Sequence, residues 1–174
     1  MTTKNNNYVY ISYKDNSYSI KSVNLLDGTV TYENAVSQGV IAAKNEYYAV
    51  YSNKTTDECS ILNIETGEPI ATYPKSEVSL FKIILLGEYF AIWQSKSGYL
   101  EDYTRYNLQG IADVEMHFSK DDKISFAQGG IERAQGMDCL SLEKREENDG
   151  GITERGLYRS DMTPILELNA KTTI

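Results

Sequence analysis

One pattern recurs four times along this chain of 174 residues and limits the folds that it can adopt. Each copy begins with a turn-forming Asn, Asp or Gly and continues as an apolar and aromatic run. The copies are NNNYVYISYK (5–14), KNEYYAVYSNK (44–54), LGEYFAIWQSK (86–96) and KDDKISFAQGG (120–130). In the first three copies Lys14, Lys54 and Lys96 are spaced by 40 and then 42 residues. A period of this length indicates repeated supersecondary units.

Each copy is followed by a polar turn and by a second apolar segment that ends in another turn. Glycine stands in that second turn at Gly28, Gly67 and Gly110, and the fourth copy carries Asp149-Gly150. Glycine suits a tight turn because it adopts positive φ without steric strain. The 14 tyrosines against 3 prolines also favour strands, since Tyr tolerates half-buried strand positions and Pro interrupts a sheet.

A further strand is expected to close three of the units. The candidates are GVIAA (39–43), SLFKIILL (79–86) and PILEL (164–168), while the third unit shows none. Four strands at this period are typical of a β-propeller blade. We therefore predict a single all-β domain over residues 1–174, with four antiparallel, propeller-like repeats in approximate units 5–43, 44–86, 87–119 and 120–168. The alternative is an irregular β-sandwich or meander.

The segment YVYISYKDNSYSIKSVNLLDGTVTYE (8–33) and its echo at 48–73 resemble the repeats of quinoprotein (PQQ-type) and YVTN-type propellers. Both read as strand, turn, strand, Thr-Gly-type turn and strand. The resemblance covers about three quarters of the chain and implies a propeller-like architecture. Tyr32 and Tyr73 replace the tryptophan that typically ends the quinoprotein unit, and no quinone-binding residue can be matched. The resemblance therefore implies no cofactor.

The net charge of −8 argues against direct nucleic-acid binding, since no Lys/Arg cluster offsets it, and fits a surface that meets a basic partner. The residues after Met1 lack the apolar core of a signal peptide. The longest apolar run, 83–86, is far shorter than the roughly 20 residues that span a bilayer. We expect a cytoplasmic protein that does not bind membranes.

No catalytic, cofactor-binding or metal-binding residue is predicted. Cys59 and Cys139 align at similar points of the second and fourth units and are expected to be free, buried thiols, because their spacing matches neither a zinc site nor a disulfide framework. His117 is the single histidine and is expected to be structural or exposed. Acidic neighbours such as Glu101-Asp102 and Asp121-Asp122 leave a carboxylate-dependent hydrolase as an alternative.

The candidate partner-binding residues come from two places. Tyr51 and Trp93 align with Ile11, and equivalent positions of repeated units tend to line one surface; the alternative is packing between units. Segment 132–151 interrupts the repeat and is expected to form a charged projecting hairpin or helical turn. Its candidates are Arg133, Glu143, Arg145 and Glu147.

These observations favour a non-enzymatic protein-binding module on a small propeller-like β scaffold. The first alternative is an acidic inhibitor or decoy, of the phage or mobile-element type, that blocks a basic site on a nucleic-acid-handling protein. The second alternative is the small hydrolase. Four units are about the fewest that close a propeller, so a homo-oligomer formed through an open sheet edge is also expected as an alternative.

Overall fold

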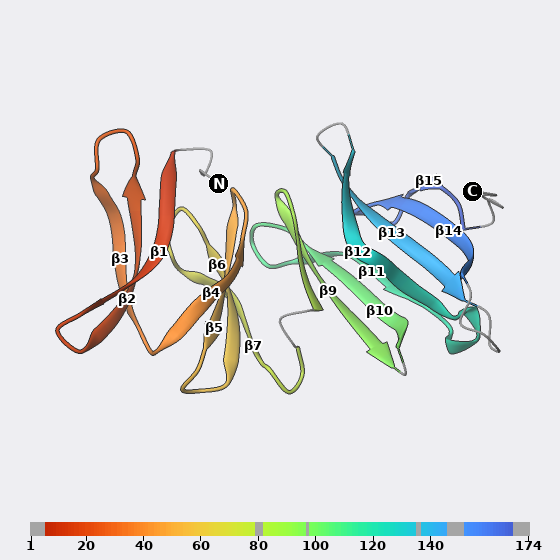
Figure 1. Ribbon diagram of the computed structural model, residues 1–174, viewed down its shortest axis with the longest axis horizontal. Helices are drawn as coiled ribbons and strands as arrows, with labels where there is room; N and C mark the ends of the chain where they lie inside the picture. Colours follow the sequence, from red (N-terminus) through yellow and green to blue (C-terminus); the bar gives the residue numbers. More distant parts are fainter. Residues whose placement is uncertain (1–5, 79–81, 97, 135–136, 146–151, 169–174) are drawn as a thin grey trace. The chain divides into compact units, whose positions relative to one another are not determined.

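The computed structural model describes residues 6–78, 82–96, 98–134, 137–145 and 152–168. These residues form four antiparallel sheets that follow one another along the chain (Figure 1). The first sheet contains β1 (Asn7–Lys14), β2 (Ser17–Asn24) and β3 (Val30–Val36). The second contains β4 (Gly39–Lys44), β5 (Tyr48–Asn53), β6 (Glu58–Asn63) and β7 (Pro69–Pro74).

The third sheet contains β8 (Ile83–Leu86), β9 (Tyr89–Lys96), β10 (Tyr99–Tyr106) and β11 (Ala112–His117). A 3-10 turn, η2 (Lys120–Asp122), precedes the fourth sheet. That sheet contains β12 (Ile124–Ala134), β13 (Met137–Arg145), β14 (Ile152–Arg159) and β15 (Pro164–Leu166). In every sheet the strands pair in the order in which they occur in the sequence. The predicted all-β, propeller-like fold class is confirmed.

The phase of the repeat differs from the predicted one. Residues 39–43 lie in β4, which pairs with β5 and therefore begins the second sheet instead of closing the first. Residues 83–86 form β8 and likewise begin the third sheet. The third sheet consequently has four strands, whereas the first has three in the described part of the chain. A strand between two turns has the same residue pattern whichever neighbour it pairs with, so the sequence did not reveal this.

The turns form where the repeat places them. Asp15 and Asn16 both have positive φ, 50° and 60°, and make the two-residue hairpin between β1 and β2. Between β2 and β3, Asn24 accepts hydrogen bonds from the Leu26 and Gly28 amides through its side chain and carbonyl respectively. The same arrangement recurs at Asn63, and it recurs at Asn107 in a turn that is one residue shorter. The predicted turn glycines are thus confirmed, with φ of 74°, 71° and 74° in the three sheets.

The chain divides into two compact units. One comprises residues 1–90 with 107–111, and the other comprises residues 91–106 with 112–174. In the first unit, a buried cluster joins the first two sheets: Val9, Ile20, Ala49, Tyr51, Leu62 and Ile64. In the second unit, buried apolar residues include Leu100, Ile124, Leu140 and Leu142.

Cys59 and Cys139 are buried thiols that form no disulfide bond within the described residues, as expected. They are not equivalent, however, because Cys59 lies on the third strand of its sheet and Cys139 on the second strand of another. The difference follows from the shifted phase of the repeat. Burial raises the pKa of the Cys59 thiol, which disfavours the nucleophilic thiolate.

Over the described ranges of the chain, no helix is long and apolar enough to cross a membrane.

Candidate functional site

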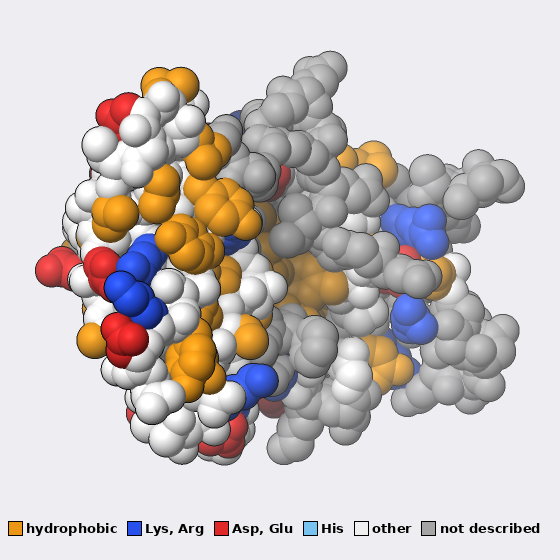
Figure 2. Space-filling model, turned by 60° about the vertical axis from the view of Figure 1, so that its left-hand side comes forward, with side chains coloured by type: hydrophobic (Ala, Val, Ile, Leu, Met, Phe, Trp, Pro, Cys, Tyr) orange, Lys and Arg blue, Asp and Glu red, His pale blue; other side chains and the backbone are white. Residues whose placement is uncertain are grey.

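Exposed apolar side chains are concentrated at the start of the chain. Of the eleven large exposed hydrophobic residues in the described ranges, six lie between residues 8 and 40: Tyr8, Tyr13, Leu25, Leu26, Val30 and Val40. Leu26, at the tip of the β2–β3 turn, is 78% exposed. Figure 2 shows hydrophobic side chains gathered on this side of the molecule, with Lys/Arg and Asp/Glu side chains among them. We call these six residues the apolar patch; they are spread over the first sheet and β4, and Tyr8 and Tyr13 lie on opposite faces of β1 because they are five positions apart in one strand.

A groove lies beside this patch, between β1 and β4. Residues 8–11 line it on one side and residues 39–44 on the other, and it encloses about 570 Å³. Apart from Lys44, the lining side chains are apolar, aromatic or absent. A groove of this size and composition falls within the range typical of ligand-binding sites.

Lys44 is the charged group of the groove. Its Nζ donates a hydrogen bond to the Val9 carbonyl at 3.1 Å and lies 3.9 Å from the centroid of the Tyr8 ring. The first contact gives a partner to a backbone oxygen of β1, and the second is a cation–π interaction. Lys44 therefore joins β4 to β1 at one end of the groove.

The opposite end of β4 is held by Tyr51. Its hydroxyl donates to the Ser37 carbonyl, just before β4 begins. A Cβ atom added to Gly39 would come within 2.5 Å of the Tyr51 ring and 2.4 Å of the Ser52 carbonyl oxygen, so glycine is required here for close approach. Tyr51 thereby positions the β4 wall of the groove from within the core.

The predicted aromatic pair occupies packed positions. Tyr51 is 5% exposed within the core cluster of the first unit. Trp93, on β9, is partly buried and meets Phe126 edge-on, with ring centroids 5.1 Å apart. These positions agree with packing, the alternative that the sequence left open. A direct partner contact by either residue stays a prediction.

Segment 132–151 does not leave the fourth sheet where it is described: its residues 132–134 and 137–145 belong to β12 and β13. Glu143 is 2% exposed and contacts Arg145 at 3.1 Å and Arg155 at 3.4 Å. Arg133 pairs through its backbone with Asp138, and Glu147 lies outside the described residues. Glu143 thus serves as a buried partner for two arginines on its own sheet.

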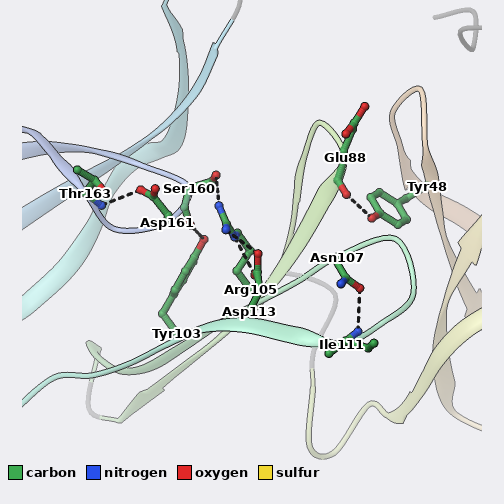
Figure 3. A network of polar contacts seen from close by, with 10 residues as sticks. All are labelled: Tyr48, Glu88, Tyr103, Arg105, Asn107, Ile111, Asp113, Ser160, Asp161 and Thr163. Carbon is green, nitrogen blue, oxygen red and sulfur yellow. Dashed lines mark hydrogen bonds and ion pairs between the residues drawn. The ribbon is translucent and has the colours of Figure 1, made fainter.

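Sequence reasoning missed a polar network in the second unit (Figure 3). Arg105 makes a bidentate pair with Asp113, with N–O distances of 3.0 and 2.6 Å, and donates to Ser160 Oγ at 2.8 Å. The fully buried Tyr103 donates its hydroxyl to the Ser160 carbonyl at 2.8 Å, and burial raises its pKa. The network links β10 and β11 to the β14–β15 turn, so its evident role is structural. No sequence pattern pairs residues 55 positions apart.

The first unit contains a comparable bond. Tyr48 is fully buried on β5, and its hydroxyl donates to the Glu88 carbonyl at 2.6 Å (Figure 3). Its ring also meets Phe90 edge-on at 5.4 Å. The equivalent residue of the first copy, Tyr8, is 42% exposed. The side chain at this position of the repeat is therefore buried in the second sheet and exposed in the first.

The groove and a second cavity give no support to carboxylate chemistry. The second cavity, about 550 Å³, includes one carboxylate, Glu68, in its lining, and the β1–β4 groove includes none. A glycosidase needs two carboxylates about 5 to 10 Å apart. In the described ranges no group of three or more His, Cys, Asp or Glu side chains is placed to hold a metal ion. His117 is exposed, with Nδ1 2.7 Å from Asp102 Oδ1.

No protein-family model matches the chain, and no curated protein matches it. Among solved structures, it is similar to a europium-containing methanol dehydrogenase, with 9% identity, a TM-score of 0.43, and coverage of 90% of this chain and 38% of that one. It is also similar to Hsv2 from Kluyvelomyces marxianus, with 12% identity, a TM-score of 0.44, and coverage of 88% of this chain and 46% of that one. A third similar structure is BamB from Moraxella catarrhalis, with 10% identity, a TM-score of 0.36, and coverage of 93% of this chain and 69% of that one. The chain thus spans less than half of the first two proteins.

Proposed function

We propose that this protein is a non-enzymatic module that binds another protein through its first sheet and the adjoining β4. The observation that carries the proposal is the apolar patch beside the β1–β4 groove. Large exposed apolar surfaces on soluble proteins mark interaction sites, because covering them removes unfavourable contact with water.

The charges of the chain favour an apolar contact over a charge-driven one. Several acidic groups already have basic partners: Glu33 lies 2.9 Å from Lys21, and Asp113 and Glu143 are paired with arginines. Such pairs reduce the acidic field that a decoy of a nucleic-acid-binding surface needs. The patch itself contains no charged residue. An apolar interface is also less sensitive to salt, which separates the two functions experimentally.

The test compares two exposed turn residues. Leu26→Ser removes the most exposed member of the patch, and Ile111→Ser, beside the equivalent turn of the third sheet, is the matched control because Ile111 is also exposed and lies outside the patch. The tagged chain and both variants are used to capture partners from the native host, with mass spectrometry and a salt series. Loss of an interface leucine costs about 1–2 kcal/mol, or roughly tenfold in affinity.

We expect one partner that the wild type and Ile111→Ser retain at high salt and that Leu26→Ser loses. Equal retention by both variants would refute the proposed surface. Release by moderate salt would favour the acidic decoy instead, and failure of the wild type to retain any specific protein would refute the module.

A further inference from the structure

Within the described residues, the first sheet has one strand fewer than each of the other sheets, and the missing strand has a defined place. In the second sheet, β5 pairs with β4 on one side and with β6 on the other. In the third sheet, β9 likewise pairs with β8 and with β10. The corresponding strand of the first sheet is β1, and in the described ranges it pairs with β2 alone. The two aligned tyrosines also differ in exposure: Tyr48, which contacts Glu88 and Phe90, is 0% exposed, and Tyr8 is 42% exposed.

The open edge of β1 presents its backbone to the groove. The Leu25 amide donates to the Asn6 carbonyl at 2.9 Å, which extends the β1–β2 ladder and sets its alternation. Residues 6, 8, 10 and 12 therefore bond to β2, and Val9 and Ile11 direct their N–H and C=O groups to the other edge. The bond from Lys44 Nζ to the Val9 carbonyl agrees with this assignment, and an added strand would displace Lys44 from that acceptor. An edge of this kind is a template for an added strand.

We propose that this edge binds a short, extended, apolar segment of another protein, which completes the first sheet as its fourth strand. The chain itself shows which residues fill such a place: GVIAAK in β4 and IILL in β8, both without aromatic residues. In β4, Ile41 lies opposite Tyr51, the residue aligned with Ile11. An antiparallel segment with Val, Ile, Leu or Ala opposite Ile11 therefore fits best. This inference rests on the proposed protein-binding function and names its partner chemistry.

A second copy of the chain is the weaker occupant. The strand that a second copy would offer is its own β1, NYVYISYK. This strand contains Tyr8, Tyr10 and Tyr13, whereas β4 and β8 contain no aromatic side chain. The partner strand would also bring its own β2 and its own Lys44-bound β4 toward the same edge. A single strand from another polypeptide meets neither obstacle, and the groove of about 570 Å³ is of a size for a few residues.

The test uses a fluorescein-labelled peptide with the β4 sequence GVIAAK and fluorescence anisotropy with the full chain. Two further peptides are N-methylated on alternate residues. In one peptide the methyl groups block the amides that face β1, and in the other they block only the amides that face away from β1. On the protein, Ile11→Pro removes an amide from the open edge, where proline is tolerated in strands. Ile11→Ala is its matched control, because it also loses the isoleucine side chain and keeps the amide.

We expect binding by the wild type and Ile11→Ala, at least tenfold weaker binding by Ile11→Pro, and a loss of binding with one N-methylated peptide alone. No binding at millimolar peptide, or equal loss with both methylated peptides, would overturn the proposal. A wild type that is dimeric in light scattering and becomes monomeric in Ile11→Pro would assign the edge to a second copy and overturn it as well. If Leu26→Ser abolishes partner capture while the peptide does not bind, the edge proposal fails and the protein-binding function stands.

Discussion

Tyr103→Phe isolates one hydrogen bond in the core of the second unit. The Tyr103 ring is fully buried, and its hydroxyl donates to the Ser160 carbonyl at 2.8 Å. Phenylalanine keeps the ring and removes the hydroxyl alone, so packing is preserved. The change leaves the Ser160 carbonyl without this donor in a site where Ser160 Oγ is already held by Arg105.

The expected cost is the net value of one buried hydrogen bond. Such a bond contributes about 0.5–1.5 kcal/mol, and an acceptor left unpaired in a buried site can raise the cost to about 1–3 kcal/mol. We therefore expect Tyr103→Phe to lower the free energy of unfolding by about 1–2 kcal/mol. For a chain of this size that corresponds to a fall in Tm of roughly 2–6 °C.

The measurement is urea unfolding of the wild type and variant, followed by tryptophan fluorescence of Trp93 in the same unit. Tyr8→Phe is the control, because Tyr8 is 42% exposed and its loss of a hydroxyl is expected to change stability by less than about 0.5 kcal/mol. The midpoint shift is interpretable if the dependence on urea is unchanged. Equal midpoints for Tyr103→Phe and the wild type would refute the reasoning that this bond stabilises the unit.

Three further predictions follow from other buried contacts. Gly39→Ala places a Cβ within 2.5 Å of the Tyr51 ring, and we expect a loss of about 1–3 kcal/mol in urea unfolding. Burial raises the pKa of Tyr32 to about 12 from its ordinary 10.0, so the folded state favours the neutral phenol. The contribution of Tyr32 to stability should therefore be constant below about pH 10 and be lost as the pH rises toward 12. Tyr32→Phe should reduce the fall in stability over that alkaline range, and an unchanged profile there in this variant would contradict the assignment. Glu143→Ala removes the 2%-exposed carboxylate between two half-exposed arginines, and we expect thermal unfolding to show a loss of about 1–3 kcal/mol, with a smaller loss for Glu143→Gln.

The candidate site could be predicted in part. The apolar and aromatic residues of β1 are evident from NYVYISYK, but their exposure is not, because Tyr8 and Tyr48 occupy the same place in the repeat and differ from 42% to 0% exposed. The difference depends on residues distant in sequence, because the Tyr48 ring packs against Phe90 and its hydroxyl donates to the Glu88 carbonyl. The predicted site residues Tyr51 and Glu143 show the converse, since an aromatic side chain and a charged one both became buried.

The repeat, the strands and the turns can be obtained from consecutive residues. Hydrophobic patterns and residues such as Asn24 and Gly28 act within a few positions, where turn geometry and side-chain chemistry are local. The pairing of β4 with β5, the burial of Tyr51 and the link between Arg105 and Ser160 depend on contacts between segments that are distant in sequence or equally well placed for two neighbours. Hydrogen bonding between strands and packing between sheets select among such alternatives. In the described part of the chain they leave β1 paired on one side only, beside an apolar groove.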